Sequence, residues 1–217
     1  MKKIITVDGP AGSGKEKISK YIARKYKMNH IDSGTLYRRL AYELVKNDIK
    51  TFELEKIKKI ISSKNKLSLR KNAVLRKEEI GKTASEIAKI EFVRKYINFQ
   101  QRLATKTINK KNGFVIDGRD IGSVVFKNAS IKLYIAVDVN IRAKRRHKQL
   151  IDMGEKSIYP KILKDIKLRD KKDKSRKNSP LVIPMGAYVV DNSSKFSITQ
   201  NQLNIIIGKY INGKYWN

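Results

Sequence analysis

The chain has 217 residues, 40% of them hydrophobic and 32% charged, which is enough apolar sequence to bury a core and argues against global disorder. It carries 50 Lys and Arg residues against 20 Asp and Glu residues, and this net charge of +30 first suggests a nucleic-acid partner. The absence of cysteine excludes disulfide frameworks and cysteine-based zinc or thiol chemistry, while His30 and His147 are too few for a multi-histidine metal site.

Strands and helices alternate from the start of the chain. Lys3–Asp8 is a short continuous apolar run, typical of a buried parallel strand, and leads through a Gly-rich turn into a helical pattern with Ile18 and Ile22. Residues 29–32 predict a short second strand, and residues 33–45 predict a helix. This order is the beginning of an α/β unit.

The middle of the chain predicts an insertion followed by a long helix. Residues 66–70 and 73–77 indicate two small strands around a turn at Lys71 and Asn72. Residues 80–108 carry apolar side chains at helical spacing and predict one continuous helix.

The last part of the chain completes the alternation. Residues 154–182 are highly charged and predict a cap together with a helix. The other expected elements are strands over 113–117, 131–137 and 188–191 and helices over 139–153 and 198–211. Strands that alternate with helices indicate a parallel sheet with crossover connections.

The positive charge is spread evenly. Each quarter of the chain carries a net charge of +7 to +9, and Lys outnumbers Arg by 37 to 13. A nucleic-acid site more often clusters its charge, relies on Arg or interleaves aromatic residues. Because Lys is the strongly hydrated cation that suits a solvated surface, this distribution favours a basic surface over a dedicated nucleic-acid site.

A glycine-rich loop follows the first predicted strand. Its residues fit the first seven positions of the pattern G-x-x-x-x-G-K-[ST]: Gly9, Pro10, Ala11, Gly12, Ser13, Gly14 and Lys15. Such glycines let backbone N–H groups close around phosphate oxygens, the following helix adds its positive end, and Lys15 can reach the β- and γ-phosphates. The position between an apolar strand and a helix argues against a chance match.

The two residues after this loop depart from the pattern. Position 16 is Glu and position 17 is Lys, so the hydroxyl group that usually helps to hold Mg²⁺ is missing. Glu16 instead places a carboxylate near the metal, where it could coordinate the ion, act through water or repel the nucleotide. Since the backbone N–H groups do not depend on that side chain, we expect phosphate binding to persist and the reaction rate to be affected.

Four further motifs follow the loop. They are Asp32-Ser33-Gly34 with Tyr37-Arg38, the segment from Thr83 to Ala88 with Val93-Arg94, the segment from Asp117 to Gly122, and the segment from Arg169 to Arg176. Together with the loop, these motifs resemble those of nucleoside monophosphate kinases, and specifically of the bacterial cytidylate kinases. The resemblance runs from Ile4 to about Asp191. The D-G-R-D-x-G box and the R-D-x-x-D-x-x-R spacing are its most specific parts.

The resemblance implies an α/β P-loop kinase fold, with a central parallel five-stranded sheet flanked by helices, an insertion that binds the nucleoside monophosphate and a short lid. It also implies a single nucleoside monophosphate kinase domain over residues 1–217. Within this domain the core would comprise about residues 1–32, 109–150 and 183–217, the monophosphate-binding part about 33–108, and the lid about 151–182.

The resemblance assigns roles on the ATP side of the site. Lys15, Arg119 and Arg176 would be the catalytic residues. ATP would contact the loop from Gly9 to Lys15 and the two residues that follow it, and the lid would place Arg142, Arg145 and Arg146 over its phosphates. The metal ligands stay unknown, with Glu16 as one candidate.

The resemblance assigns a second set of residues to CMP. Ser33, Arg38, Arg119 and Arg176 would bind its phosphate, Ser85 would lie near base and sugar, Arg94 and Asp120 would read the cytosine edge, and Arg169 and Asp173 would address the ribose. A carboxylate at position 120 suits cytosine because the N4 amine of that base is a hydrogen-bond donor. Positions 169, 173 and 176 recur at i, i+4 and i+7, which is one face of a helix.

The implied activity is ATP-dependent phosphorylation of CMP, and of dCMP, to the diphosphate, with Mg-ATP as phosphoryl donor and Mg²⁺ as cofactor. Two alternatives stay open: a weakened or inactive nucleotide- or RNA-binding relative, suggested by Glu16 and Lys17, and a kinase of UMP or AMP. We expect nucleotides as partners, no dedicated nucleic acid, no membrane and a monomeric, cytoplasmic protein, since no apolar run approaches the roughly 18 residues of a membrane span.

Overall fold

The computed structural model describes residues 3–63, 66–70, 72–108 and 112–211. These residues form two compact units, and each unit has a hydrophobic core of its own. The first unit holds the described residues up to His30 and from Asn112 onward, and the second holds Ile31 to Ile108. No helix in the described ranges is both long enough and apolar enough to cross a membrane.

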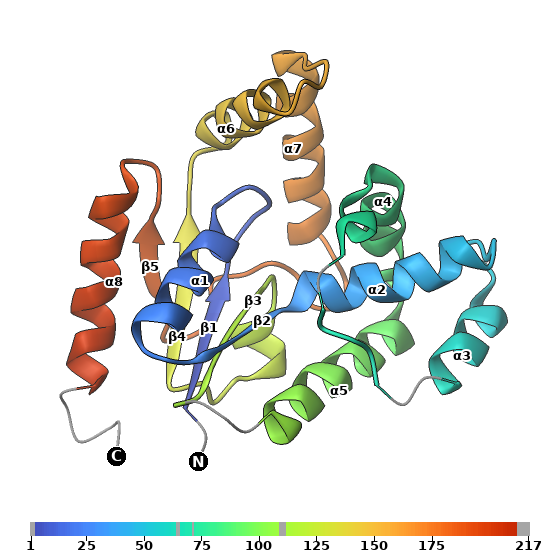
Figure 1. Cartoon of the computed structure of the whole chain (residues 1–217), viewed down its shortest axis with the longest axis horizontal. Helices are drawn as coiled ribbons and strands as arrows, with labels where there is room; N and C mark the ends of the chain where they lie inside the picture. The colour runs from blue at the N-terminus through green and yellow to red at the C-terminus, as the bar shows by residue number, and fades with distance from the viewer. Residues whose placement is uncertain (1–2, 64–65, 71, 109–111, 212–217) are drawn as a thin grey trace. The chain divides into compact units, whose positions relative to one another are not determined.

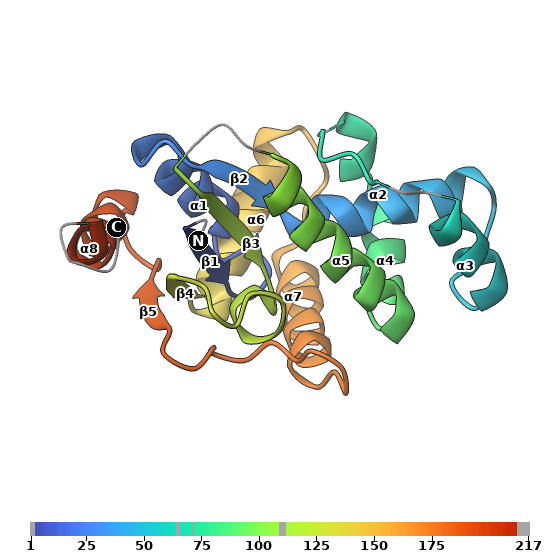
Figure 2. The same cartoon turned by 90° about the horizontal axis from the view of Figure 1, so that it is seen from below.

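A five-stranded sheet organises the fold. Its strands are β1 (Ile4–Asp8), β2 (Asn29–Asp32), β3 (Phe114–Gly118), β4 (Ile131–Ala136) and β5 (Tyr188–Asp191), in the order β2-β3-β1-β4-β5 (Figures 1 and 2). β1 pairs in parallel with β3 and β4, and β4 pairs in parallel with β5. A central parallel strand is buried on both faces, and β1 meets that demand with Ile5 and Val7 on one face and the buried Thr6 on the other. The predicted five-stranded parallel sheet is confirmed.

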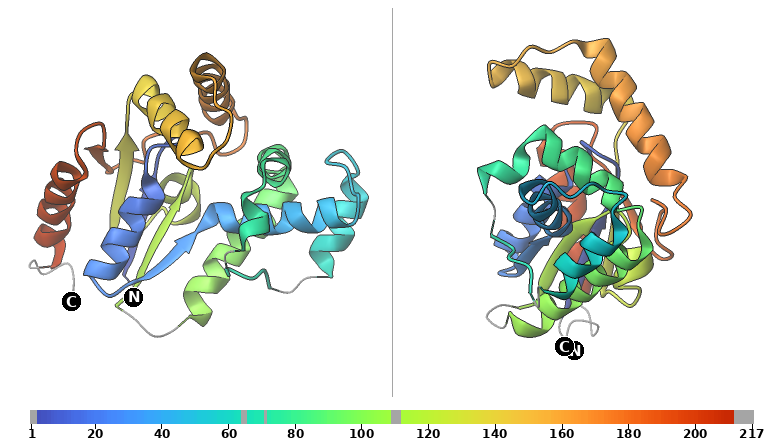
Figure 3. Two further views of the ribbon diagram at one scale, coloured as in Figure 1. Left: turned by 45° about the horizontal axis from the view of Figure 1, so that its top comes forward. Right: turned by 90° about the vertical axis from the view of Figure 1, so that its right-hand side faces the viewer.

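Four α-helices accompany the sheet in the described part of the first unit. They are α1 (Lys15–Lys25), α6 (Val139–Asp152), α7 (Tyr159–Lys174) and α8 (Phe196–Ile211). α1 packs on β1 and β3 and contributes Ile18 and Ile22 to the core, while α6 and α7 pack against each other (Figure 3). Asp138 caps α6, because its carboxylate accepts the backbone N–H of Asn140 at 2.8 Å. A short π-helical turn, η2 (Ile121–Val125), follows β3.

Apart from the end of β2, the regular elements in the described part of the second unit are helical. Its elements are α2 (Ser33–Lys46), α3 (Leu54–Ser62), the 3₁₀ turn η1 (Ala73–Arg76), α4 (Glu78–Ile87) and α5 (Glu91–Thr107). Its core joins Leu36 and Leu40 of α2 to Ile57 of α3 and Ile97 of α5. Helix α3 is not among the elements that the sequence analysis predicts.

The two strands predicted over residues 66–70 and 73–77 are wrong. Residues 66–70 have no regular secondary structure, and η1 takes the place of the second strand. The backbone here finds side-chain partners instead of a neighbouring strand: Leu67 donates its N–H to the buried amide oxygen of Gln100 at 3.0 Å. Lys71, in the predicted turn, lies outside the described residues.

The single helix predicted over residues 80–108 is also wrong. α4 ends at Ile87 and α5 begins at Glu91. Neither glycine nor proline occurs at residues 88–90, between the two helices, so the local sequence gives no breaking signal there. The guanidinium group of Arg94 donates to the carbonyl oxygen of Ala88 at 2.9 Å, and this buried contact satisfies a carbonyl at the end of α4.

Candidate active site

The glycine-rich loop of residues 9–14 joins the carboxyl end of β1 to the first turn of α1. Gly12 and Gly14 have φ angles of +74° and +83°, in the left-handed region that favours glycine. Gly14 directly precedes α1, so the first N–H groups of that helix, which have no intrahelical partner, adjoin the loop. This is the arrangement with which a helix N-terminus binds a phosphate.

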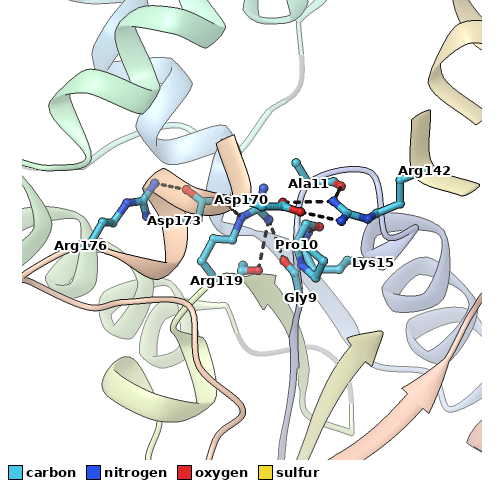
Figure 4. A network of polar contacts seen from close by, with 10 residues as sticks. Gly9, Pro10, Ala11, Lys15, Arg119, Arg142, Asp170, Asp173 and Arg176 are labelled. Carbon is cyan, nitrogen blue, oxygen red and sulfur yellow. Dashed lines mark hydrogen bonds and ion pairs between the residues drawn. The ribbon is translucent and has the colours of Figure 1, made fainter. Parts of the chain in front are cut away.

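Lys15 is the first residue of α1, and its side chain folds back over the loop (Figure 4). Its ammonium group donates a hydrogen bond to the carbonyl oxygen of Pro10 at 2.9 Å. Burial, reinforced by the nearby guanidinium group of Arg119, lowers the pKa of Lys15 to about 7. The loop therefore holds a cation whose charge the surroundings oppose, and an anionic ligand would offset that cost.

Arg119, just after β3, links the loop to α7. Its guanidinium group donates to the carbonyl oxygen of Gly9 at 3.1 Å and to the carboxylate of Asp173 at 2.8 Å (Figure 4). Arg176 forms an ion pair with the other carboxylate oxygen of Asp173. Burial would raise the pKa of Asp173, but the guanidinium groups of Arg119 and Arg176 outweigh it and hold that pKa below its usual value. These three predicted site residues thus lie together in the first unit.

Arg142 of α6 is a second clamp on the loop. Its guanidinium group donates to the carbonyl oxygen of Ala11 at 3.0 Å and to that of Val137 at 3.1 Å. It also makes a two-point ion pair with Asp170 of α7, at 3.0 Å and 2.5 Å (Figure 4). The arginine is 4% exposed, so this pair is largely shielded from solvent.

The other two arginines predicted on α6 have contacts away from the loop. Arg145 donates to the carbonyl oxygens of Ser193 and Ser194 at 3.2 Å and 3.4 Å. Arg146 is exposed and donates to Gln149 of its own helix at 3.0 Å. Of the three arginines, Arg142 is the one that is hydrogen-bonded to the glycine-rich loop.

Asp8, the last residue of β1, holds the segment that carries Arg119. Its two carboxylate oxygens accept the backbone N–H groups of Ile121 and Gly122 at 2.8 Å and 2.7 Å. Burial raises the pKa of Asp8 to about 6 against the lowering effect of these two N–H groups. The neighbouring Asp120 is 5% exposed, and its negative charge adds to the rise.

Four further predicted residues belong to the second unit. Ser33 is the buried first residue of α2, and Arg38 of the same helix donates to the carbonyl oxygen of Leu75 at 2.7 Å. Ser85 lies on α4, and Arg94 lies buried on α5 with its guanidinium group 5.9 Å from the ring centroid of Tyr37. The nucleotide roles predicted for these four residues stay predictions.

Glu16 and Lys17 make other contacts than those expected of metal ligands. Glu16 forms an ion pair with Lys20 at 2.8 Å, one turn along α1. The ammonium group of Lys17 lies 4.1 Å from the ring centroid of Phe196 on α8. Among the described residues, no group of three or more His, Asp or Glu side chains is arranged to hold a metal ion. These residues fit a Mg²⁺ ion carried mainly by nucleotide phosphates and water, which is how proteins commonly bind it.

The comparisons with known proteins decide the family. A family model described as cytidylate kinase matches residues 5–210. The chain belongs to the cytidylate kinase family. A cytidylate kinase from Rickettsia bellii is 36% identical over 206 residues, which cover 94% of this chain and 92% of that protein. A cytidylate kinase from Bartonella bacilliformis is 39% identical over 190 residues, covering 88% of this chain and 86% of the relative.

A solved structure supports the fold of this cytidylate kinase family member. An uncharacterized protein from Eubacterium ventriosum superposes with a TM-score of 0.52 at 16% sequence identity, covering 96% of this chain and 99% of that one. At such low identity the likeness concerns the fold alone. The family match and the parallel sheet together establish the predicted P-loop kinase fold.

The sequence analysis assigned no role to several polar residues at the site of this cytidylate kinase family member. Asn192 holds the loop, Asp170 holds Arg142, which contacts the loop, and Asp8 holds the segment that follows Arg119, all through buried or half-buried hydrogen bonds. His30 is 2.5 Å from a carboxylate oxygen of Asp117 and so has a structural partner. The sequence feature that could have identified Asp8 and Asn192 is a polar residue at or next to the carboxyl end of an apolar strand.

Proposed function

We propose that this chain transfers the γ-phosphoryl group of ATP to CMP, and also to dCMP. The observation that carries the proposal is the glycine-rich loop with its buried Lys15 and the adjoining Arg119, in a chain of the cytidylate kinase family. Burial, together with the Arg119 guanidinium group, lowers the pKa of Lys15, so the ammonium charge is not fully compensated there. A polyphosphate is the ligand class that balances such a site.

The reaction needs positioning and charge neutralisation more than covalent help from the protein. A phosphate oxygen of CMP forms a bond to the γ-phosphorus of ATP, and the bond from that phosphorus to the bridging oxygen of ADP breaks, giving CDP and ADP. The CMP phosphate is already an anionic nucleophile, so no general base is required. Lys15, Arg119 and Arg176 would stabilise the charge on the transferring group.

We assign ATP to the loop and the residues around it. Backbone N–H groups of residues 9–15 would bind the phosphates, and Arg142, with Arg145 and Arg146 on the same helix, would approach them when the lid of residues 151–182 closes. Closure would exclude water, which otherwise competes with CMP for the phosphoryl group.

We assign CMP to a second set of residues. Arginine guanidinium groups can bind the two oxygens of a phosphate together, whereas Asp120 offers an acceptor to the N4 amine of cytosine. The proposed set is Ser33, Arg38, Arg119 and Arg176 for the phosphate, Arg94, Asp120 and Ser85 for the base, and Arg169 and Asp173 for the ribose.

Mg²⁺ would arrive bound to ATP. The ion would lower the negative charge on the phosphates, and Glu16, the acidic side chain of the first turn of α1, is one candidate ligand, which would have to leave its ion pair with Lys20. The missing hydroxyl at positions 16 and 17 leaves phosphates and water as the other ligands.

A substrate panel tests the proposal. With Mg-ATP as donor, we expect turnover of CMP and dCMP to exceed that of UMP and AMP by at least about tenfold in kcat/KM, because one lost or reversed hydrogen bond to a buried polar group has that effect. Asp120→Asn should narrow the ratio of CMP to UMP, since the amide can donate to the O4 acceptor of uracil.

The exposed Asp165→Asn on α7 is the matched control and should keep the ratio of the unchanged chain. No turnover of any nucleoside monophosphate, with nucleotide binding retained, would favour the inactive relative. Preferred turnover of UMP or AMP would instead move the proposal to another base.

A further inference from the structure

Asn192, the first residue after β5, is hydrogen-bonded to the phosphate loop. The backbone N–H of Asn192 donates to Ala136 at the end of β4 at 3.0 Å, so the sheet fixes this residue. The side-chain amide of Asn192 donates to the carbonyl oxygen of Ser13 at 2.9 Å. Asn192 is 6% exposed, and this contact joins residues 179 positions apart in the sequence.

Thr199 of α8 completes the arrangement. Its hydroxyl group donates to the amide oxygen of Asn192 at 2.8 Å, and the threonine is 1% exposed. The two ends of the amide are therefore assigned by their partners: the oxygen accepts from Thr199, and the NH₂ group donates to Ser13. A flipped amide would set two acceptor oxygens, those of Asn192 and Ser13, against each other.

The absence of a side chain at Gly14 leaves room for the amide group of Asn192. A Cβ atom at position 14 would lie 2.5 Å from the amide nitrogen of Asn192, closer than atoms approach without a shift. The φ angle of +83° independently favours glycine there. The side chain of Asn192 thus fills the space beside the loop that a larger residue at position 14 would need.

We propose that Asn192, oriented by Thr199, is a positioning residue for the phosphate loop. In a trans peptide the carbonyl oxygen and the following N–H point in opposite directions. By drawing the Ser13 carbonyl toward itself, Asn192 turns the N–H of Gly14 to the opposite side, where it is available to the phosphates of ATP. The inference rests on the proposed function, and it identifies Asn192 as the residue that orients the loop peptide for phosphate binding.

Two changes at position 192 test this role. Asn192→Ala removes the donor and should weaken binding of Mg-ATP, measured by titration calorimetry, about tenfold at both pH 7.5 and pH 5.5. Asn192→Asp keeps the shape but presents an acceptor to Ser13, so binding should fall at least as far at pH 7.5. At pH 5.5 a protonated carboxyl can donate again, and affinity should return to within about threefold of the unchanged chain at that pH.

Matched variants separate positioning from general damage. Thr199→Val removes the hydroxyl donor and should weaken Mg-ATP binding several-fold, about as far as one hydrogen bond allows, whereas Thr199→Ser should not. Asn204→Asp alters another amide of α8, which accepts from the Tyr21 hydroxyl at 2.9 Å, and should bind Mg-ATP as before. The KM for CMP should stay unchanged in every variant.

The outcomes are distinguishable. Asn192→Ala binding Mg-ATP as tightly as the unchanged chain would overturn the inference and leave the proposed function in place. An equal loss at both pH values for Asn192→Asp, with the carboxyl shown by NMR titration to be protonated at pH 5.5, would also overturn it, because the donor would then not be what matters. Absence of Mg-ATP binding by the unchanged chain would overturn the proposed function and this inference together.

Discussion

Lys15 has a charge that its surroundings oppose and that a phosphate would stabilise. Burial and the Arg119 guanidinium group lower its pKa to about 7, and the carboxylates of Asp117 and Asp8 offset only part of that effect. The ordinary value is 10.5, so unfolding lets the side chain bind its proton more tightly. The stability of the free protein should therefore rise with pH between about 7 and 10 as far as this residue is concerned.

Binding of Mg-ATP should be coupled to proton uptake by Lys15. Phosphates beside the ammonium group favour its charged form and raise its pKa, so a largely neutral Lys15 at pH 8 gains a proton on binding. We expect an uptake of roughly 0.8 proton at pH 8 and roughly 0.1 at pH 6. Calorimetric titrations in buffers of different ionisation enthalpy measure this number.

Lys15→Arg provides the control for this coupling. A guanidinium group stays protonated across this range, so the heat of binding should not depend on the buffer. Equal proton uptake at pH 6 and pH 8 by the unchanged chain would contradict the assignment to Lys15.

At the scale of elements, a buried ion pair between α6 and α7 also contacts the phosphate loop. Arg142 of α6 contacts both the Ala11 carbonyl and the Asp170 carboxylate of α7. The side chains of Arg142 and Asp170 are 5% and 15% exposed. Breaking a buried pair leaves one charge without compensation, which costs more than breaking an exposed pair.

Asp170→Asn should lower the stability of α7. The neutral amide retains the shape but can accept from Arg142 at only one atom, so we expect the free energy of unfolding to fall by roughly 2 kcal/mol. Urea unfolding measures this loss, and hydrogen exchange of the backbone amides in Tyr159–Lys174 should show faster opening.

Asp165→Asn serves as the control on the same helix. This aspartate is exposed, and its change should alter the stability by less than about 0.5 kcal/mol. Equal effects of the two substitutions would show that helix charge, and not the pair with Arg142, determines the stability of α7.

For the whole molecule, the net charge of +30 creates a positive electrostatic potential around an anion-binding site. The lysines are spread over the chain, and the side chains that contact the phosphate loop in Figure 4 are a few arginines and Lys15. The surface lysines need no partner of their own, but they attract anionic substrates to the protein. Salt screens this attraction over about 10 Å at 0.1 M.

Substrate capture should be salt-sensitive. Raising KCl from about 50 to about 500 mM should lower kcat/KM for ATP and for CMP at least about threefold, mainly through KM, since screening acts on encounter and not on the bound state. Steady-state kinetics at constant free Mg²⁺ provide the measurement. A parallel fall in kcat with unchanged KM would place the salt effect on the chemical step instead.

Local patterns were sufficient for the sheet and the loop but not for the second unit. The apolar runs at β1 and β4 and the glycines after β1 specify their structure through neighbouring residues, and these elements match the prediction closely. The sequence analysis missed helix α3 although Leu54, Ile57 and Ile61 stand at helical spacing, and of its residues only Ile57 is fully buried. At the break after Ile87, Arg94 reaches back to the carbonyl oxygen of Ala88, a contact that no local propensity contains.

The sequence by itself determined the alternation of strands and helices, the phosphate loop and the family motifs, because these are set by residue type at fixed spacing along the chain. Only the tertiary structure decided which polar groups hold the loop. Asn192 contacts Ser13, Arg142 contacts Ala11, and Asp8 accepts from Gly122, in each case across more than a hundred positions. The physical reason is that a buried polar group takes whichever partner the packing brings near it. The same distinction applies to the net charge of +30. The amino-acid composition sets its size, whereas the fold places a few of those cations against the loop.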